Sequence, residues 1–70
     1  MTTIMNEKNY GSYREFQVHG FSNKEEATIW LRAWEDRCMG YSPIGSVYET
    51  TTVDAEKAYV VYCKVWNSCD

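Results

Sequence analysis

The chain has 70 residues, of which 44% are hydrophobic and 16% aromatic, with one proline and four glycines. This length predicts one small domain, and so many large apolar side chains argue against disorder. No run approaches the ~20 apolar residues of a membrane-spanning helix, so we expect no membrane segment. Ten acidic residues against seven basic ones give a formal net charge of −3. Duplex-binding proteins cluster lysine and arginine on one face, so this balance argues against non-specific nucleic-acid binding.

The cysteines indicate neither a disulfide framework nor a zinc site. Cys38, Cys63 and Cys69 are odd in number and form no C-x-x-C pair. We therefore expect three free thiols and a location in the reducing cytoplasm.

The first segment of the chain is polar and has no periodicity. Residues 1–12, MTTIMNEKNYGS, are expected to form a flexible arm. Residues 13–19 then alternate between two faces, which is typical of a half-buried strand. Phe16 and Val18 share one face of this strand with Arg14.

A helix is predicted over residues 23–38. Ser22 and Glu25 have the S-x-x-E spacing of a capping box, in which each side chain bonds the backbone amide of the other. Gly40 is placed to end the helix in a left-handed conformation, and Pro43 prevents its continuation.

The apolar residues of this helix fall on one stripe. At 100° per residue the stripe is about 100° wide, which is typical of a core-facing helix. Ile29 lies on the far side and should be exposed. The stripe consists of Ala27, Trp30, Leu31, Trp34 and Cys38.

The last part of the chain predicts a β-hairpin. Residues 45–53 are rich in β-branched and aromatic side chains, with Val47 and Val53 on one face. Residues 54–57 form a polar turn, and residues 58–66, AYVVYCKVW, are the most apolar strand.

The predicted fold class is α+β, a two-layer β-α-β-β domain with one helix packed on one face of a three-stranded sheet. If residues 13–19 and 58–66 are parallel neighbours, the sheet order is 1-3-2 with the last strand central. The domain spans residues 13–66, and residues 67–70 are a frayed C-terminus.

One turn supports a resemblance to known proteins. Residues 40–45, GYSPIG, match a G-[WY]-x-P-x-G turn, and a helix with E-x-x-x-x-h-x-x-h spacing begins at Glu25 or Glu26. Over residues 13–66 the chain resembles small uncharacterised β-α-β-β domains of bacteria and phages. The resemblance implies this fold, with Tyr41 tucked against the sheet, and implies no activity. In size, aromatic richness and mild acidity the chain is also similar to bacteriophage accessory inhibitors of the anti-CRISPR type.

No catalytic set or metal site is indicated. His19 is the single histidine, and Glu15 lies about 13 Å along the same strand, too far to share a proton or a metal ion. Cys63 lies in an apolar strand, where burial makes a thiol inert. Cys38, at a helix C-terminus, is disfavoured as a thiolate by the helix dipole. We expect no enzyme activity, no cofactor and no metal.

The informative feature is the sheet face that the helix does not cover, which we call the open face. Aromatic side chains on such a face can stack single-stranded bases, pair with a second sheet in a homodimer, or dock a foreign protein. Alternatively, residues 1–12 fold back over it with Ile4 and Tyr10 as plugs. The predicted members are Tyr13, Gln17, His19, Tyr48, Thr50, Thr52, Val60, Tyr62, Lys64 and Trp66.

The favoured hypothesis is a non-enzymatic protein-binding module, a phage-encoded inhibitor of a host or defence protein. Its partner is that protein or a second copy of the chain. The alternatives are a single-stranded nucleic-acid-binding sheet and a structural homodimer. The residues predicted to bind a partner are Tyr62, Trp66, Tyr48, His19, Lys64 and Gln17.

Overall fold

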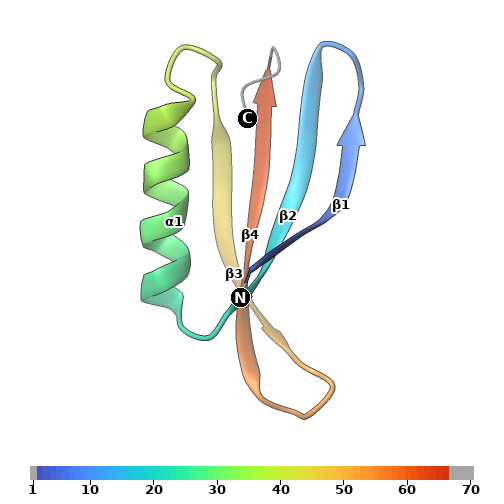
Figure 1. Cartoon of the computed structure of the whole chain (residues 1–70), viewed down its shortest axis with the longest axis vertical. Coiled ribbons are helices and arrows are strands. Elements are labelled where there is room, and N and C mark those ends of the chain that lie inside the picture. The colour runs from blue at the N-terminus through green and yellow to red at the C-terminus, as the bar shows by residue number, and fades with distance from the viewer. Residues whose placement is uncertain (1, 67–70) are drawn as a thin grey trace.

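The computed structural model describes residues 2–66, which form one antiparallel sheet and one helix (Figure 1). The sheet has the strand order β1-β2-β4-β3. The predicted frayed C-terminus, residues 67–70, lies outside the described part of the chain. In chain order the elements are β1 (Thr3–Asn9), β2 (Tyr13–Phe21), α1 (Lys24–Arg37), β3 (Ile44–Thr51) and β4 (Lys57–Trp66).

The predicted three-stranded sheet is wrong, because Thr3–Asn9 adds a fourth strand along β2. This strand shows no apolar alternation in the sequence because all of its residues are exposed. Its ladder is also interrupted by a register shift between Met5 and Lys8, where Asn6 has a φ of 55°. Backbone pairing, rather than burial of side chains, therefore holds it in the sheet, and the domain remains α+β.

The predicted parallel pairing of the first and last strands is also wrong. β2 and β4 run antiparallel, with Tyr13 opposite Trp66 at one end and Phe21 opposite Tyr59 at the other. The helix leads from β2 to β3 at the sheet edge, and β4 returns by a hairpin into the position between them. The helix between β2 and β3 returns the chain, so these two strands are parallel to each other, and β4, the hairpin partner of β3, runs opposite to both.

The helix begins one residue later than the capping box predicts. Asn23, not Ser22, is the N-cap: its backbone is extended and its side-chain oxygen accepts the Glu26 amide at 2.8 Å. The predicted C-terminal glycine is confirmed, since Gly40 has a φ of +98°. This helix is too short and polar to cross a bilayer, and residues 2–66 contain no other helix.

The turn after the helix joins the sheet through its backbone. The carbonyl oxygen of Tyr41 accepts the amide of Trp66 at 3.0 Å. Tyr41 is 42% exposed, so its ring is not buried against the sheet as the resemblance implies.

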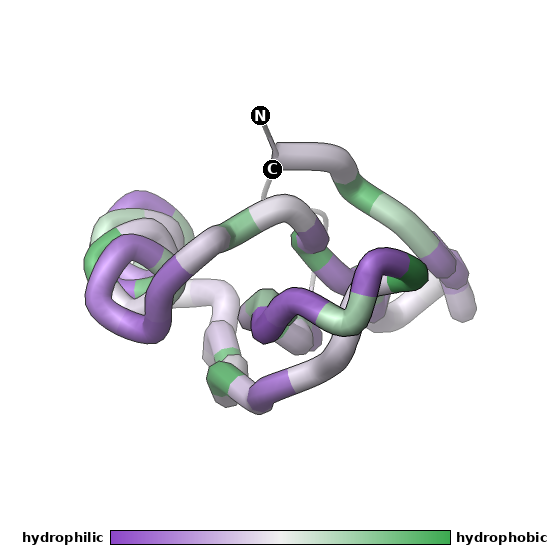
Figure 2. Tube along the Cα trace, turned by 90° about the horizontal axis from the view of Figure 1, so that it is seen from below, coloured by the Kyte–Doolittle hydropathy of each residue, from purple (hydrophilic) through white to green (hydrophobic). Residues whose placement is uncertain are grey.

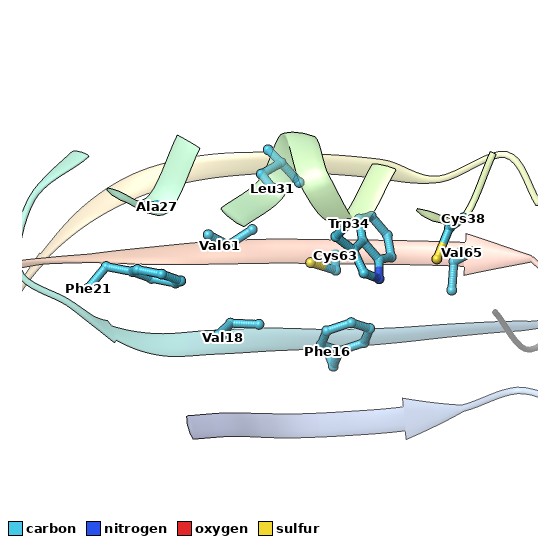
Figure 3. Packing of buried hydrophobic residues seen from close by; sticks show 10 residues of the cluster. All are labelled: Phe16, Val18, Phe21, Ala27, Leu31, Trp34, Cys38, Val61, Cys63 and Val65. Atoms are coloured by element: carbon cyan, nitrogen blue, oxygen red, sulfur yellow. The ribbon is translucent and has the colours of Figure 1, made fainter. Parts of the chain in front are cut away.

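The core lies between α1 and one face of the sheet (Figure 3). The predicted apolar stripe is confirmed, with Trp34 only 1% exposed and Trp30 packed at the margin of the core. Ile29 is 61% exposed, as predicted. Other buried residues are Phe16, Val18 and Phe21 of β2, Ala27, Leu31 and Cys38 of the helix and its C-cap, and Val61, Cys63 and Val65 of β4.

The helix covers only part of that face. It packs against β3, β4 and β2 but does not contact β1. Seen along the strands, α1 lies to one side of the sheet and β1 at its opposite end (Figure 2). The other face of all four strands has no helix over it among residues 2–66.

The strand β3 ends earlier than the strand predicted over residues 45–53. It ends at Thr51, and Val53 is fully exposed instead of facing the core. The turn begins at Thr52, whose amide donates to the Glu56 carbonyl at 2.9 Å, and Ala55 has a φ of 62°. The threonine run has strand propensity, but these turn bonds end the strand within it.

The cysteines differ from the three free thiols that the sequence predicts. Cys38 is disulfide-bonded, and Cys63 is a free, buried thiol. Cys69 lies outside the described residues.

Candidate functional site

The strand registers place all of the predicted partner-binding residues on the open face. Residues opposite each other in a ladder share a face, and neighbours along a strand alternate between faces. Val61, Cys63 and Val65 of β4 point into the core, so the alternate residues of β4, and the residues opposite them on the neighbouring strands, point away from it. The predicted residues all lie on that outer side. These residues are Gln17 and His19 of β2, Tyr48 of β3, and Tyr62, Lys64 and Trp66 of β4.

The first strand does not cover this face. Residues 3–9 pair with the edge of β2 and lie beside it in the sheet, so the alternative of a folded-back arm is wrong. Ile4 and Tyr10, the proposed plugs, are both exposed. β1 therefore widens the open face.

An aromatic cluster occupies the end of the open face where β4 finishes. The Tyr10 and Tyr13 rings stack with centroids 4.6 Å apart, and Tyr13 lies 5.8 Å from the Trp66 ring. The Lys64 ammonium lies over two of these rings, 4.6 Å from the centroid of Tyr13 and 5.0 Å from that of Trp66. These contacts hold three aromatic side chains and one cation in place before any partner arrives.

Glu15 joins this cluster to Tyr62. Its two carboxylate oxygens accept one hydroxyl each, from Tyr62 at 2.6 Å and from Tyr10 at 3.1 Å. The hydrogen bond from Tyr62 is the main reason that the pKa of the Glu15 carboxyl is lowered. In return, the hydrogen bond to Glu15 raises the pKa of Tyr62 to about 12.

We expect Tyr62 to titrate well above a free tyrosine. Deprotonation would place a phenolate 2.6 Å from a carboxylate, so the folded protein holds this proton more tightly than the unfolded chain. The stabilisation is thus present below pH 10 and is lost as the pH rises toward about 12. Burial and the bond to Glu15 also raise the pKa of Tyr10, but absorbance at 295 nm should show a last-titrating tyrosine that disappears in Tyr62→Phe and titrates earlier in Glu15→Gln. An unchanged profile in Glu15→Gln would contradict this account.

A charged row crosses the sheet at Glu15. Lys8 of β1 lies opposite Glu15 on one side, and Lys64 of β4 lies opposite it on the other. Cross-strand pairs of opposite charge stabilise a sheet. This row carries two positive charges and one negative charge, although the whole chain has a net charge of −3.

His19 takes part in a polar cluster at the other end of the face. Its Nε2 lies 2.9 Å from the Gln17 side-chain oxygen, which also accepts the Asn6 amide at 2.8 Å. A carbonyl oxygen can only accept, so this contact is a hydrogen bond in the His19 tautomer that carries its proton on Nε2. Within residues 2–66 no three histidine, cysteine or acidic side chains converge on a metal-sized space.

Tyr48 is separate from the aromatic cluster. It lies on the edge strand β3, opposite Val60 of β4, which is itself only 1% exposed. The open face thus carries the aromatic cluster at the end of β4 and, apart from it, the single ring of Tyr48 on the edge strand.

The single free thiol among the described residues does not form a nucleophilic site. Cys63 is buried under the helix, and burial is the main cause that raises its pKa to about 12. A thiol is a nucleophile only as the thiolate, so Cys63 is unsuited to covalent chemistry.

Sequence reasoning missed several residues of the site. It placed Tyr10 on a loose arm, overlooked Lys8 and Asn6, and used Glu15 only as a distant neighbour of His19. The available signal was the alternation of residues 13–19, which puts Glu15 on the same face as Tyr13 and Gln17. No comparable signal marks β1.

No protein-family model, curated protein or solved structure matches the chain.

Proposed function

We propose that this protein is a non-enzymatic binding module that docks on another protein with its open face. The observation that supports this most strongly is the aromatic cluster of Tyr10, Tyr13 and Trp66, whose rings pack on one another. Two hydrogen bonds to Glu15 link this cluster to Tyr62. Tyrosine and tryptophan dominate the residues that contribute most binding energy at protein interfaces. Side chains fixed in advance lose little conformational entropy on binding.

The proposed partner is a host or defence protein, and the protein acts as a phage-encoded inhibitor by occupying its surface. Size, aromatic richness and mild acidity are the features that support this part of the proposal. The proposed place of action is the host cytoplasm. The disulfide-bonded Cys38 counts against that location, because disulfides are rare in reducing compartments.

Single-stranded nucleic acid is a second candidate, and the charged row favours it. Lys8 and Lys64 make this row positive, and Lys64 lies beside the Tyr13 and Trp66 rings. Stacking platforms combine aromatic rings with cations in this way. Two features oppose it: Lys64 already occupies the ring faces, and the Glu15 carboxylate in the middle of the row would repel phosphates.

Affinity capture with and without nuclease separates the two candidates. The tagged protein is mixed with a host lysate, alongside the double variant Tyr62→Ala/Trp66→Ala and the helix-surface control Ile29→Ala. We expect a nuclease-resistant protein that the control retains and the double variant loses. A nuclease-sensitive signal lost in the double variant would instead support nucleic-acid binding. A protein captured equally by all three would contradict docking through the open face.

A further inference from the structure

The two edges of the sheet are built differently. β1 carries a break in its ladder at Asn6 and two neighbouring charges, Glu7 and Lys8, which are features that prevent strands from adding to an edge. β3, at the other edge, pairs with β4 through eight consecutive residues without a shift. Within residues 2–66 no strand pairs with its outer side.

β3 lacks the usual protection of an edge strand. Its sequence IGSVYETT is long and β-prone and contains one charge, Glu49, and no proline. Ile44 and Tyr48 are exposed along it. A regular edge of this kind is a template for backbone pairing with another strand.

We propose that β3 pairs with β3 of a second copy of the chain, antiparallel and across a twofold axis. In such a ladder the side chains of two opposed residues lie on the same face of the sheet. A residue can therefore oppose only itself or a residue an even number of positions away. Three registers near the middle of β3 meet this condition. They place Val47, Tyr48 or Glu49 opposite the same residue of the second copy. The Glu49 register opposes two carboxylates and shortens the ladder, so it is disfavoured.

The register centred on Tyr48 is the most favourable of the three. It places the Tyr48 rings of the two copies side by side and Ser46 opposite Thr50 of the second copy. Aromatic pairs and hydroxyl pairs both stabilise antiparallel ladders. It also places Glu49 opposite Val47, so no like charges meet within the ladder.

This pairing has a defined consequence for the open face. A twofold axis perpendicular to the sheet leaves both helices on one side and both open faces on the other. The two sheets become one eight-stranded sheet whose open faces are continuous through Tyr48. Small domains of this size commonly complete their stability by association.

The test needs only the purified 70-residue chain, and its result does not depend on the proposed function. Sedimentation is measured up to about 1 mM, at which even a dimer with a millimolar Kd is detected. We expect a species of twice the 8.2 kDa chain mass, while Tyr48→Lys and Tyr48→Glu are each monomeric. Circular dichroism confirms that these variants fold, and the control Met5→Lys, on the β1 edge, remains dimeric.

Mixing the two variants tests the register. In the Tyr48 register, lysine of one chain faces glutamate of the other, so the equimolar mixture should regain the dimer. A mixture that stays monomeric would overturn this register. A wild-type protein that is monomeric throughout, or Tyr48 variants as dimeric as the wild type, would overturn the β3 interface.

Discussion

Replacing Trp34 with alanine should lower the free energy of unfolding by about 3–5 kcal/mol. The side chain is 1% exposed and lies between the helix and the sheet, edge-on to Phe16 with ring centroids 5.9 Å apart (Figure 3). It also stacks against Trp30 at 6.4 Å. Its removal leaves a large cavity that a single-helix layer cannot close. Small domains have a total stability of about 5–15 kcal/mol or less, so this loss is a large share.

Urea unfolding followed by circular dichroism measures this effect. Trp34→Phe should cost less than alanine, because it keeps a ring and removes an indole N–H that has no acceptor among the described residues. Ile29→Ala is the matched control, since Ile29 is exposed on the same helix and should change stability little. If Ile29→Ala were the more costly substitution, the assigned buried face of the helix would be wrong.

Gly45→Ala should cost about 1–3 kcal/mol, although it adds only one methyl group. A Cβ atom at Gly45 would overlap Leu31 Cδ1 and lie 3.0 Å from the Tyr62 carbonyl oxygen. Gly45 therefore sets how closely the helix approaches the β3–β4 pair. To admit a methyl group, Leu31 or the backbone has to move, which disturbs the packing of the core.

A double-mutant cycle with Leu31→Ala tests this cause. If the overlap with Leu31 is the source of the cost, Gly45→Ala should destabilise the Leu31→Ala protein less than it destabilises the wild type. Equal costs in the two backgrounds would show that the damage arises elsewhere, in the backbone of the β3–β4 ladder.

The elements with side-chain periodicity were predictable from the sequence. The helical stripe repeats at the spacing of one buried face, and residues 13–19 alternate at the spacing of a half-buried strand. Each pattern arises because side chains there are sorted between core and solvent. Val53 shows the limit of this reasoning, because a valine after three threonines has strand propensity while the turn bonds of Thr52 place it in solvent.

β1 could not be predicted in this way. Its side chains are exposed, so burial imposes no pattern on its sequence, and its pairing with β2 defines it. The parallel pairing was a different error. The hairpin of the last two strands is confirmed, but it excludes the parallel pairing: a helix that returns the chain makes β3 parallel to β2, and the hairpin then makes β4 antiparallel to both.

The candidate site was predictable in its position but not in its chemistry. Alternation alone places Tyr62, Lys64 and Trp66 on the open face. The bonds of Glu15 to Tyr62 and Tyr10 join residues 47 and 5 positions apart, and they depend on the register of three strands. Alternation along each strand predicts which face a side chain occupies, but it does not predict how neighbouring strands are aligned.

The central claim is that the open face, and not the helix surface, binds a partner protein. Its most direct test is the dissociation constant of the captured partner for the wild type, Tyr62→Ala, Trp66→Ala and Ile29→Ala. Truncating an interface hot spot costs about 2 kcal/mol or more, so each open-face variant should bind at least about tenfold more weakly. Ile29→Ala should bind like the wild type. Full affinity in both open-face variants, or a loss confined to Ile29→Ala, would contradict the account.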